Sequence, residues 1–569
     1  MHDLVIRGGT VVDGTGVPAR TADVAISNGI VTDVGKVDGA ARETLDADGL
    51  LVTPGVVDVH THFDGQLTWD EMLTPTCWHG VTTVVVGNCG VGFAPVHGDK
   101  HDWLIGLMEG VEDIPGAALS TGINWEWETF PEYLDAVDRK RLVLDVGTQV
   151  PHGAVRGYVM GERGAKNEPA TPEDIAAMAE IVREGIEAGA LGFSTSRTIA
   201  HMAIDGEPVP GTFAAEDELF GIGRVLGELG RGVFELAPAG ALGEDLAAPD
   251  REMAWMRKLS AAIDRPVTFA LTQNDHDPDA WRRMLELAGQ AIDEGARVRP
   301  QVAGRPVTLL LGLQTFHAFS YCPSYGAIGM LSLAERVQRM RDPELRRALL
   351  AEVRHGDAAI LQFVDPERVF PLGENPNYEP TRDSSIAARA RREQRDVFDV
   401  YYDALLEDDG YQLLLRPLLN YTDFNLDALR EMLLHPTSAW GLGDGGAHCG
   451  TTCDASTPTF MLTHWARDRD HERLPLEWVV RKMTKETASL YGLGDRGELT
   501  PGKLGDVNLV DLEHLRLERP VMVHDLPGDA RRFVQGSQGY VATVKRGRVV
   551  LRDGEDQGER PGQLIRGSR

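Results

Sequence analysis

Two histidines stand two residues apart at the end of an apolar run near the start of the chain. Gly55 to Gln66 reads GVVDVHTHFDGQ and contains His60 and His62. Residues i and i+2 of an extended strand point to the same side. Both imidazoles therefore face one way, as a metal with nitrogen ligands at about 2.0–2.1 Å requires. The alternative is a pair of hydrogen-bonded histidines in a polar cleft, and the motif alone leaves both interpretations open.

Two further residues of metal-binding type follow apolar runs elsewhere in the chain. Cys89 ends the stretch VVVGNC, and Asp444 lies in the turn GLGDGG. A lone cysteine is usually a buried structural residue, and an aspartate before glycine is usually part of a turn. Together with His60 and His62, however, they place four metal-capable side chains at the ends of three expected strands. This combination favours a metal site.

The elements that would position these residues are short apolar runs that alternate with helical patterns, which is typical of βα units and a parallel sheet. Eight of them favour a closed (β/α)₈ TIM barrel. An open doubly wound sheet is disfavoured because the first βα turn lacks the G-x-G-x-x-G pattern. In a closed barrel the last strand lies beside the first, which predicts that Asp444 approaches His60 and His62. The expected strands are Val52–His60, Val81–Cys89, Leu142–Val150, Ala190–Ser196, Gly232–Ala237, Pro266–Thr272, Arg297–Val302 and Ser438–Asp444.

Three further features organise the chain. A helix is predicted after Thr171, which has the residue types of an N-cap, a proline and an acidic third position. Hairpin-like runs at both ends predict one small β-domain from residues 1–54 and 498–569, with the barrel at 55–497. Residues 303–436 are far too many for one connection and must fold as an insertion before strand eight. We interpret this insertion as an active-site lid or pocket wall, with a purely packing role as the alternative.

Composition excludes several classes of protein. The 569 residues carry 57 Lys and Arg against 87 Asp and Glu, a formal net charge of −30. Nucleic acid and anionic membrane are therefore poor partners, and a small-molecule substrate is expected. No stretch resembles a signal peptide or a membrane span, and the five cysteines have no framework spacing, which predicts a cytoplasmic protein. The sequence leaves open whether the protein forms a homo-oligomer.

With these features the chain resembles the N-acyl-D-amino-acid deacylase (D-aminoacylase) branch of the amidohydrolase superfamily. The resemblance rests on IRGGTVVDGTG, PGVVDVHTHFD, GVTTVVVGNCGVGFAPV, PHGAVRGYVMG, EAGALGFSTS, His435-Pro436, GLGDGG and the segment KMTKETASLYGLGDRGELTPGKLGDVNLVDL. These stretches cover both ends of the chain and several barrel segments. The resemblance implies a metal-bearing (β/α)₈ barrel with a β-sandwich formed by both termini, usually with zinc, that hydrolyses an amide.

The chain also departs from that family's pattern. The family has a histidine at the end of strand five, where this chain has Glu235, and a His-His-Lys cluster after strand six, where it has none. The family's arginine after the strand-eight aspartate also has no match. These departures predict one zinc ion and substrates beyond N-acyl-D-amino acids. Glu235 is interpreted either as a direct ligand or as an acceptor that orients a histidine. His152, His276 and His448 are each retained as a substitute ligand.

The predicted function is metal-dependent hydrolysis of a carbon–nitrogen amide bond. His60, His62 and Asp444, with Cys89 or Glu235, would hold the divalent ion, and Asp444 would carry the proton. An N-acyl-D-amino acid, a cyclic amide, a dipeptide or an acylated amine are all compatible substrates. The alternative is a catalytically altered or metal-free relative that serves as a small-molecule-binding scaffold, because fold does not fix function.

Overall fold

The computed structural model describes residues 1–567, apart from the side chains of residues 358 and 359. Its central element is a parallel eight-stranded sheet in the order β16–β12–β11–β10–β9–β8–β7–β6. Each of the eight strands overlaps one of the eight expected from the sequence, although the expected strand Val52–His60 is divided between β5 of the other sheet and β6. They are β6 (Val56–Asp58), β7 (Val81–Val86), β8 (Asp145–Pro151), β9 (Gly192–Ser196), β10 (Val233–Ala237), β11 (Val267–Ala270), β12 (Val298–Val302) and β16 (Ala439–Trp440).

The sheet closes into a barrel just beyond its two outer strands. Thr61, after β6, forms a parallel bridge with Gly445, after β16. The His62 N–H donates to the Gly445 carbonyl over 2.7 Å, and the Asp444 N–H donates to the His60 carbonyl over 2.9 Å. The seam of the barrel therefore runs through the residues that the sequence marked as chemically active. The predicted (β/α)₈ barrel is confirmed.

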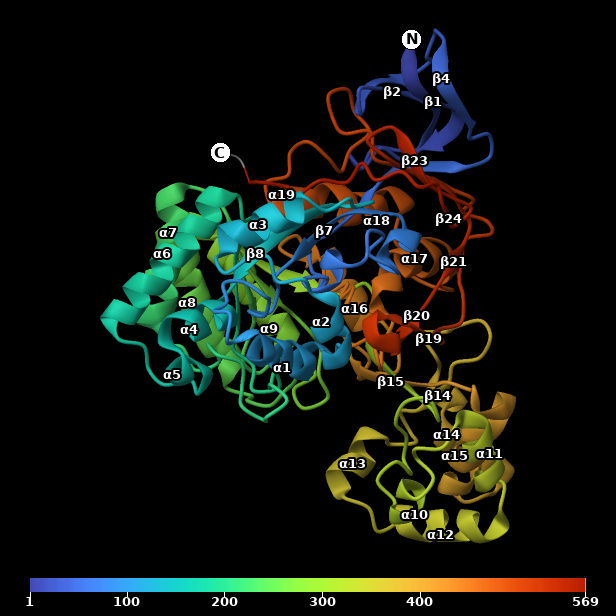
Figure 1. The fold of residues 1–569 in the computed structure, drawn as a ribbon. Helices are drawn as coiled ribbons and strands as arrows, with labels where there is room; N and C mark the ends of the chain where they lie inside the picture. Colours follow the sequence, from blue (N-terminus) through green and yellow to red (C-terminus); the bar gives the residue numbers. More distant parts are fainter. Residues whose placement is uncertain (568–569) are drawn as a thin grey trace.

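Helices surround the barrel in the order that the alternating pattern predicts (Figure 1). The predicted start of α6 is confirmed, because the Thr171 hydroxyl accepts from the Asp174 N–H and the Asp174 carboxylate accepts from the Thr171 N–H. Its residues Met178, Val182 and Ile186 are buried. The helices between the strands include α3 (Phe130–Asp138), α4 (His152–Met160), α6 (Pro172–Ala188), α7 (Glu216–Leu229), α8 (Ala248–Ile263), α9 (Ala280–Asp293) and α16 (Asp427–Leu434).

Both ends of the chain meet in a second sheet, as expected. Its strand order is β24–β23–β22–β17–β5–β1–β2–β3, with β4 beside β1. In Figure 1 the blue and red segments lie together at the top of the view. The division at residues 54 and 498 stays a prediction. The strands are β1 (His2–Val11), β2 (Arg20–Ser27), β3 (Ile30–Gly35), β4 (Ala41–Asp46), β5 (Leu51–Pro54), β17 (Val507–Val510), β22 (Tyr540–Lys545), β23 (Arg548–Arg552) and β24 (Glu555–Asp556).

A buried ion cluster joins this sheet to the barrel. Asp145, the first residue of β8, accepts hydrogen bonds from Lys545 over 2.8 Å, Arg496 over 2.7 Å and Arg546 over 3.0 Å. Asp145 and Lys545 are fully buried. Burial alone would raise the pKa of Asp145, but these three cations outweigh it and lower the pKa to about 2. The carboxylate therefore stays charged and ties the second sheet to the barrel.

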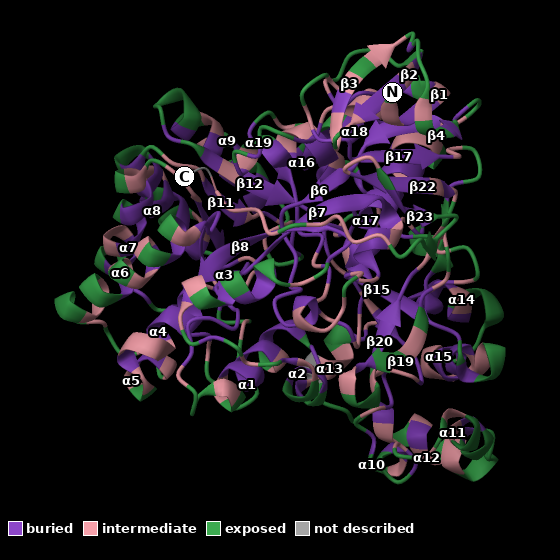
Figure 2. Cartoon of the chain, turned by 45° about the horizontal axis from the view of Figure 1, so that its top comes forward, coloured by how far each residue is buried: buried purple, intermediate pink, exposed green. Residues whose placement is uncertain are grey.

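The insertion folds into a separate lobe, at the lower right in Figure 1. It has its own buried apolar core, which includes Phe319, Tyr401 and Tyr402, and Figure 2 shows buried residues inside it. The lobe contains β13 (Val307–Leu311), β14 (Phe370–Pro371), β15 (Leu414–Leu419), α10 (Pro323–Gly326), α11 (Leu333–Met340), α12 (Pro343–Val353), α13 (Ala358–Phe363), α14 (Ile386–Glu393) and α15 (Val397–Leu406).

None of the described helices of the protein is long and apolar enough to cross a membrane.

Candidate metal centre

Three donor side chains converge at the carboxyl ends of the first two barrel strands. His60 and His62 follow β6, and Cys89 follows β7. One nitrogen of each histidine and the Cys89 sulfur all lie within 4.8 Å of one another, and all three residues are buried. The period-two spacing of the histidines therefore places both rings on the same side, as the sequence predicts.

Asp444 approaches the two histidines from the last strand. Its Oδ1 lies 3.4 Å from His60 Nε2 and 3.7 Å from His62 Nε2. The Asp444 backbone has a φ of +44°, a left-handed conformation that aspartate adopts in tight turns more readily than most residues. Gly443 before it is required, because a Cβ there would lie 2.2 Å from the Asp58 carboxylate. The turn GLGDGG thus holds one carboxylate against both imidazoles.

The geometry and chemistry of these donors fit a zinc ion. Two ligands at about 2.0–2.3 Å from a tetrahedral ion lie about 3.3–3.8 Å from each other. His60 Nε2 lies 3.4 Å from Cys89 Sγ and 3.4 Å from Asp444 Oδ1, and His62 Nε2 lies 3.7 Å from that oxygen. Nitrogen, sulfur and oxygen donors together suit zinc rather than magnesium or calcium.

Two residues that the sequence analysis missed contact the outer sides of the histidine rings. His60 Nδ1–H donates to Gln301 Oε1 over 3.0 Å, which leaves the lone pair on Nε2, the nitrogen that faces Cys89 and Asp444. His62 Nδ1 lies 3.4 Å from the buried Glu112 carboxylate. Such outer acceptors are the usual partners of metal-binding histidines. Gln301 stood in an expected strand and could have been found, whereas Glu112 ends helix α1 (His101–Glu112) and gave no signal.

Glu235, at the third position of β10, lies behind this cluster rather than among its inward donors. Its Oε2 accepts from the Cys89 N–H over 2.9 Å, and its Oε1 lies 3.8 Å from His60 Nδ1. It therefore approaches His60 from the side away from Nε2. Burial, with help from Asp444 and Glu112, raises the pKa of Glu235 to about 8. The arrangement favours the interpretation of Glu235 as an orienting residue.

The electrostatics of the cluster favour a bound cation. Burial lowers the pKa of His60 to about 4. Although burial also opposes the charged form of His62, Glu112 and Asp444 raise its pKa to about 9. Burial would raise the pKa of Asp444, but the two histidines hold it well below its usual range. Oε1 of Glu112, Oε1 of Glu235 and Nδ1 of His62 are buried polar atoms without a hydrogen bond among the described residues, as expected beside a charged centre.

The three histidines retained as substitutes occupy different places. The ring of His152 is taken up by hydrogen bonds to a threonine hydroxyl and to Glu218. His448 Nε2 lies 3.8 Å from the Glu112 carboxylate, so it borders the site without reaching the inward donors. His276 is not part of the donor group that the described residues form. These positions favour Cys89 and Asp444 over any of the three as the partners of the histidine pair.

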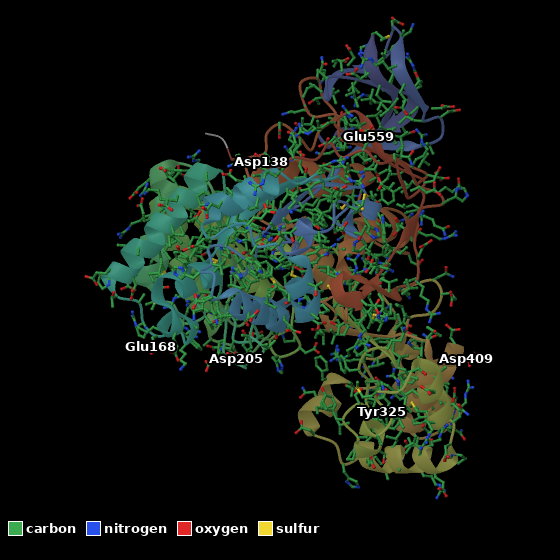
Figure 3. The ribbon with its side chains drawn as sticks, in the orientation of Figure 1. Asp138, Glu168, Asp205, Tyr325, Asp409 and Glu559 are labelled. Carbon is green, nitrogen blue, oxygen red and sulfur yellow. The ribbon has the colours of Figure 1, made fainter. Side chains whose placement is uncertain are left out.

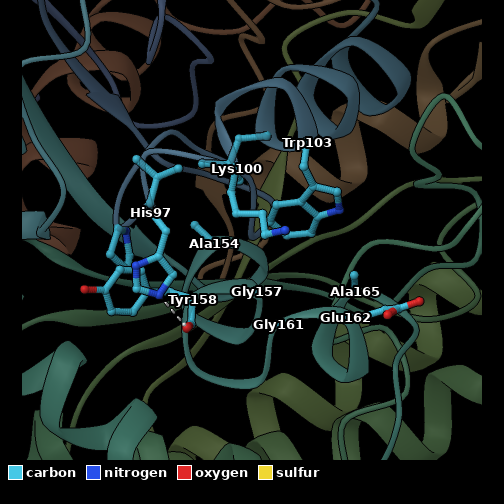
Figure 4. Close-up of a pocket in the computed structure, with 12 residues that line it drawn as sticks. His97, Lys100, Trp103, Ala154, Gly157, Tyr158, Gly161, Glu162 and Ala165 are labelled. Carbon is cyan, nitrogen blue, oxygen red and sulfur yellow. Dashed lines mark hydrogen bonds between the residues drawn. The ribbon is translucent and has the colours of Figure 1, made fainter.

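A cavity of about 220 Å³ lies between α4, α5 (Glu162–Ala165) and the start of α1 (Figure 4). His97 stacks on Tyr158 at its edge, with ring centroids 3.9 Å apart, and Lys100 and Trp103 line another side. Among the described residues, those that line this cavity include none of His60, His62, Cys89, Glu235 and Asp444. It is therefore separate from the donor cluster.

Comparison with known proteins agrees with this site and fold. A model of the amidohydrolase family matches residues 43–551. The chain belongs to the amidohydrolase family. It is 27% identical over 525 residues to the D-aminoacylase of Alcaligenes xylosoxydans xylosoxydans, covering 90% of this chain and 88% of the relative. The resemblance found in the sequence is confirmed, and with it the class of a metal-dependent hydrolase of amide carbon–nitrogen bonds.

Two solved structures share the whole architecture. A D-aminoacylase studied for its binuclear metal centre superposes with a TM-score of 0.65 at 23% identity, covering 99% of this chain and 100% of that one. The N-acyl-D-glutamate deacylase of Bordetella bronchiseptica, complexed with zinc and a phosphonate mimic of the tetrahedral intermediate, gives a TM-score of 0.65 at 22% identity and covers both chains fully. At this identity the two structures show a shared fold.

Proposed function

We propose that the protein hydrolyses an amide of a small molecule at a single zinc ion bound by His60, His62 and Cys89, with Asp444 as the proton carrier. The observation that carries the proposal is the position of the Asp444 carboxylate, which faces the inward nitrogens of both histidines at 3.4 and 3.7 Å. A carboxylate on this side of the histidines lies where it can accept a proton from water at the metal and pass it to the leaving nitrogen. The D-aminoacylase relative supports an acyl amine as the general substrate type.

The roles of the side chains follow from their positions. Zinc at such a site polarises a carbonyl and lowers the pKa of water toward about 7. Asp444 accepts the proton of the attacking water and returns it to the leaving nitrogen, so that one residue serves as base and then as acid. Gln301 fixes the tautomer of His60, and Glu112 faces the outer nitrogen of His62.

A single ion is supported by the chemistry of the neighbouring strand ends. Within the described part of the chain, the group of His60, His62 and Cys89 is the one set of three metal-capable donors that lie close enough together. After β11, Gln273 is engaged with the loop that follows β15, where its N–H donates to Asn420 and its Nε2 to Asp423. The end of β11 therefore offers the amide side chain of Gln273 where a second metal would need imidazole or carboxylate ligands.

The surroundings of the site support a substrate that is apolar and lacks a free carboxylate. Arg197 and Arg305 follow β9 and β12, but each is already paired, with Glu252 and Asp454 respectively. An unpaired substrate carboxylate in such a pocket would be costly. The loops after β9 and β10, which are joined by a hydrogen bond, instead expose large apolar side chains. These are Ile199, Met202, Ile204, Phe213, Leu242 and Leu246.

The insertion 303–436 is proposed as a wall of the same site. Leu310 in β13 donates its N–H to the carbonyl of Thr451, in the loop that follows Asp444. The base of the lobe therefore contacts the segment that carries the proposed proton carrier. This contact supports a role near the substrate rather than packing alone.

Replacement of Asp444 by asparagine tests the proposal. Asp444→Asn should leave the fold and the zinc content intact and lower kcat by about 10²-fold or more, the usual size of a general acid–base contribution. Zinc content and melting temperature must be measured beside kcat, because loss of the ion alone would lower kcat too. Asp470→Asn, at an exposed position, is the matched control. A zinc-loaded Asp444→Asn enzyme with near-normal kcat would exclude Asp444 and leave Glu235 as the next candidate.

A further inference from the structure

A second cavity lies at the opposite end of the barrel from the metal centre. Its volume is about 520 Å³, and its walls come from the end of α9, the start of β12, the segments just before β11, β12 and β16, and the helical segment 476–490. The amino ends of barrel strands form the face that usually serves stability rather than catalysis. The residues of this cavity nevertheless include an unusual concentration of cations.

Four basic side chains line the cavity against one acidic side chain. The cations are Arg297, Arg299, Arg481 and Lys485, and the acid is Glu486. Two of them have outer partners, since Arg297 pairs with an aspartate over 3.0 Å and Lys485 with a glutamate over 2.6 Å. The Arg297 pair is largely exposed and contributes little, so Arg297 can also bind a ligand, whereas the Lys485 pair is half-buried and holds its cation more firmly.

Glu486, the one acidic residue of the cavity wall, already forms ion pairs with two basic side chains. Glu486 lies 3.2 Å from Arg481 Nε and 3.2 Å from the buried amine of Lys482. Arg265, which stands beside Arg297, donates to the carbonyls of Gly230 and Gly232. The local charge is therefore positive even after these ion pairs are counted.

Arg299 is the decisive residue, because it has no ion pair in the part of the chain that the structure describes. Its Nε is buried without a hydrogen-bond partner, and the side chain is only partly exposed. Burial lowers the pKa of Arg299, and Glu486 only partly opposes this. An arginine donor that is left unsatisfied costs free energy unless a ligand or water meets it.

This positive cavity stands out in an acidic protein. The chain has a net charge of −30, and the carboxylates labelled in Figure 3, Asp138, Glu168, Asp205, Asp409 and Glu559, lie on the barrel, the lobe and the terminal domain. An excess of cations in one concave place concentrates anions there by focusing the local field.

We propose that this cavity binds a small organic polyanion, a molecule with at least two carboxylate or phosphate groups on a compact apolar frame. Guanidinium groups match such anions through paired hydrogen bonds. The apolar part of the wall, which includes Pro266, Ile292 and Leu490, provides contact for the frame. A volume of about 520 Å³ is within the range of small-molecule sites and exceeds the needs of one inorganic ion.

The site is independent of the chemistry at the metal centre, although one strand connects the two. Arg299 and Gln301 lie two residues apart on β12, and Gln301 accepts the hydrogen bond of His60. A ligand at Arg299 therefore contacts the strand whose other end orients a zinc-binding residue. Its binding can still be measured without any substrate.

Calorimetric titration of the zinc-loaded, full-length protein with citrate and with pyrophosphate tests the proposal. The parent should bind at least one of them in low salt, and the two probes distinguish a carboxylate from a phosphate ligand. Arg299→Gln should weaken binding by about 10-fold or more, and Arg299→Lys by less. Arg347→Gln, which removes an exposed charge on α12 of the lobe, is the control and should leave binding unchanged.

Two results would overturn the proposal. One is a parent protein that binds neither probe more tightly than about 1 mM at low ionic strength. The other is binding that Arg299→Gln and the control weaken equally, which would indicate a general charge effect. If Arg299→Gln melts far below the parent, Arg481→Gln replaces it, because that side chain lies on the exposed rim and its loss does not disturb the barrel interior.

Discussion

The hydrogen bond between Gln301 and His60 makes the strongest test of how this site is assembled. Gln301→Met keeps the size of the side chain and removes the acceptor of the His60 Nδ1–H, 3.0 Å away in a buried place. When zinc is bound, His60 needs its lone pair on Nε2, so the proton must stay on Nδ1 without a partner. In the metal-free protein the ring can move that proton to Nε2. The cost of an unsatisfied donor, about 1–3 kcal/mol, therefore falls on the zinc-bound form alone.

This cost corresponds to a zinc affinity that is about 5- to 150-fold weaker. Competition against a chromophoric zinc chelator measures it directly, with melting temperature as the check on folding. Gln412→Met is the matched control, because Gln412 is also buried but bonds to Leu413 in the lobe. A folded Gln301→Met protein whose zinc Kd stays within about twofold of the parent would refute the assigned tautomer and the inward role of His60 Nε2.

Three other predictions concern metal, substrate and pH. Elemental analysis should give one zinc per chain; two full equivalents would contradict the single site, and none after growth with added metal would favour the scaffold alternative. Plain N-acetyl-D-amino acids should be poorer substrates than cyclic amides and uncharged acyl amines in a direct screen, because Arg197 and Arg305 are already paired, and fast turnover of the acids alone would contradict this. Asp145→Asn should lower the melting temperature at pH 7. Because the pKa of Asp145 falls from 3.8 to about 2 on folding, its contribution of about 2 kcal/mol is complete above about pH 4 and is lost as the pH falls through 2. The difference in melting temperature between the parent and Asp145→Asn should therefore narrow as the pH falls from about 4 to about 2. A constant difference would show that the ion pairs of Asp145 with Lys545 and its neighbours do not cause the loss of stability.

Local sequence patterns were sufficient to predict the strands and the helix start, because neighbouring residues determine both. A run of apolar residues buried on both faces predicts a barrel strand, and Thr171 with Asp174 predicts a helix start from neighbouring atoms alone. The same reasoning placed His60 and His62 on one side of the chain. Closure of the barrel, a general property of eight βα units, then brought Asp444 to them across almost four hundred residues of sequence.

The amino-acid sequence by itself therefore determined the barrel strands, the order of strands and helices along the chain, and the types of donor side chain at the strand ends. Only the tertiary structure decided which atoms of those donors meet. The sequence could not place Glu112 behind His62, because a glutamate at the end of a helix has no preferred partner until helix and barrel have packed. It also could not choose between the two interpretations of Glu235, since the difference is the side of the His60 ring that its carboxylate approaches. The cationic cavity has the same origin: Arg299 and Arg481 are distant in sequence, and their charges matter to each other only because packing brings a strand and a helix together.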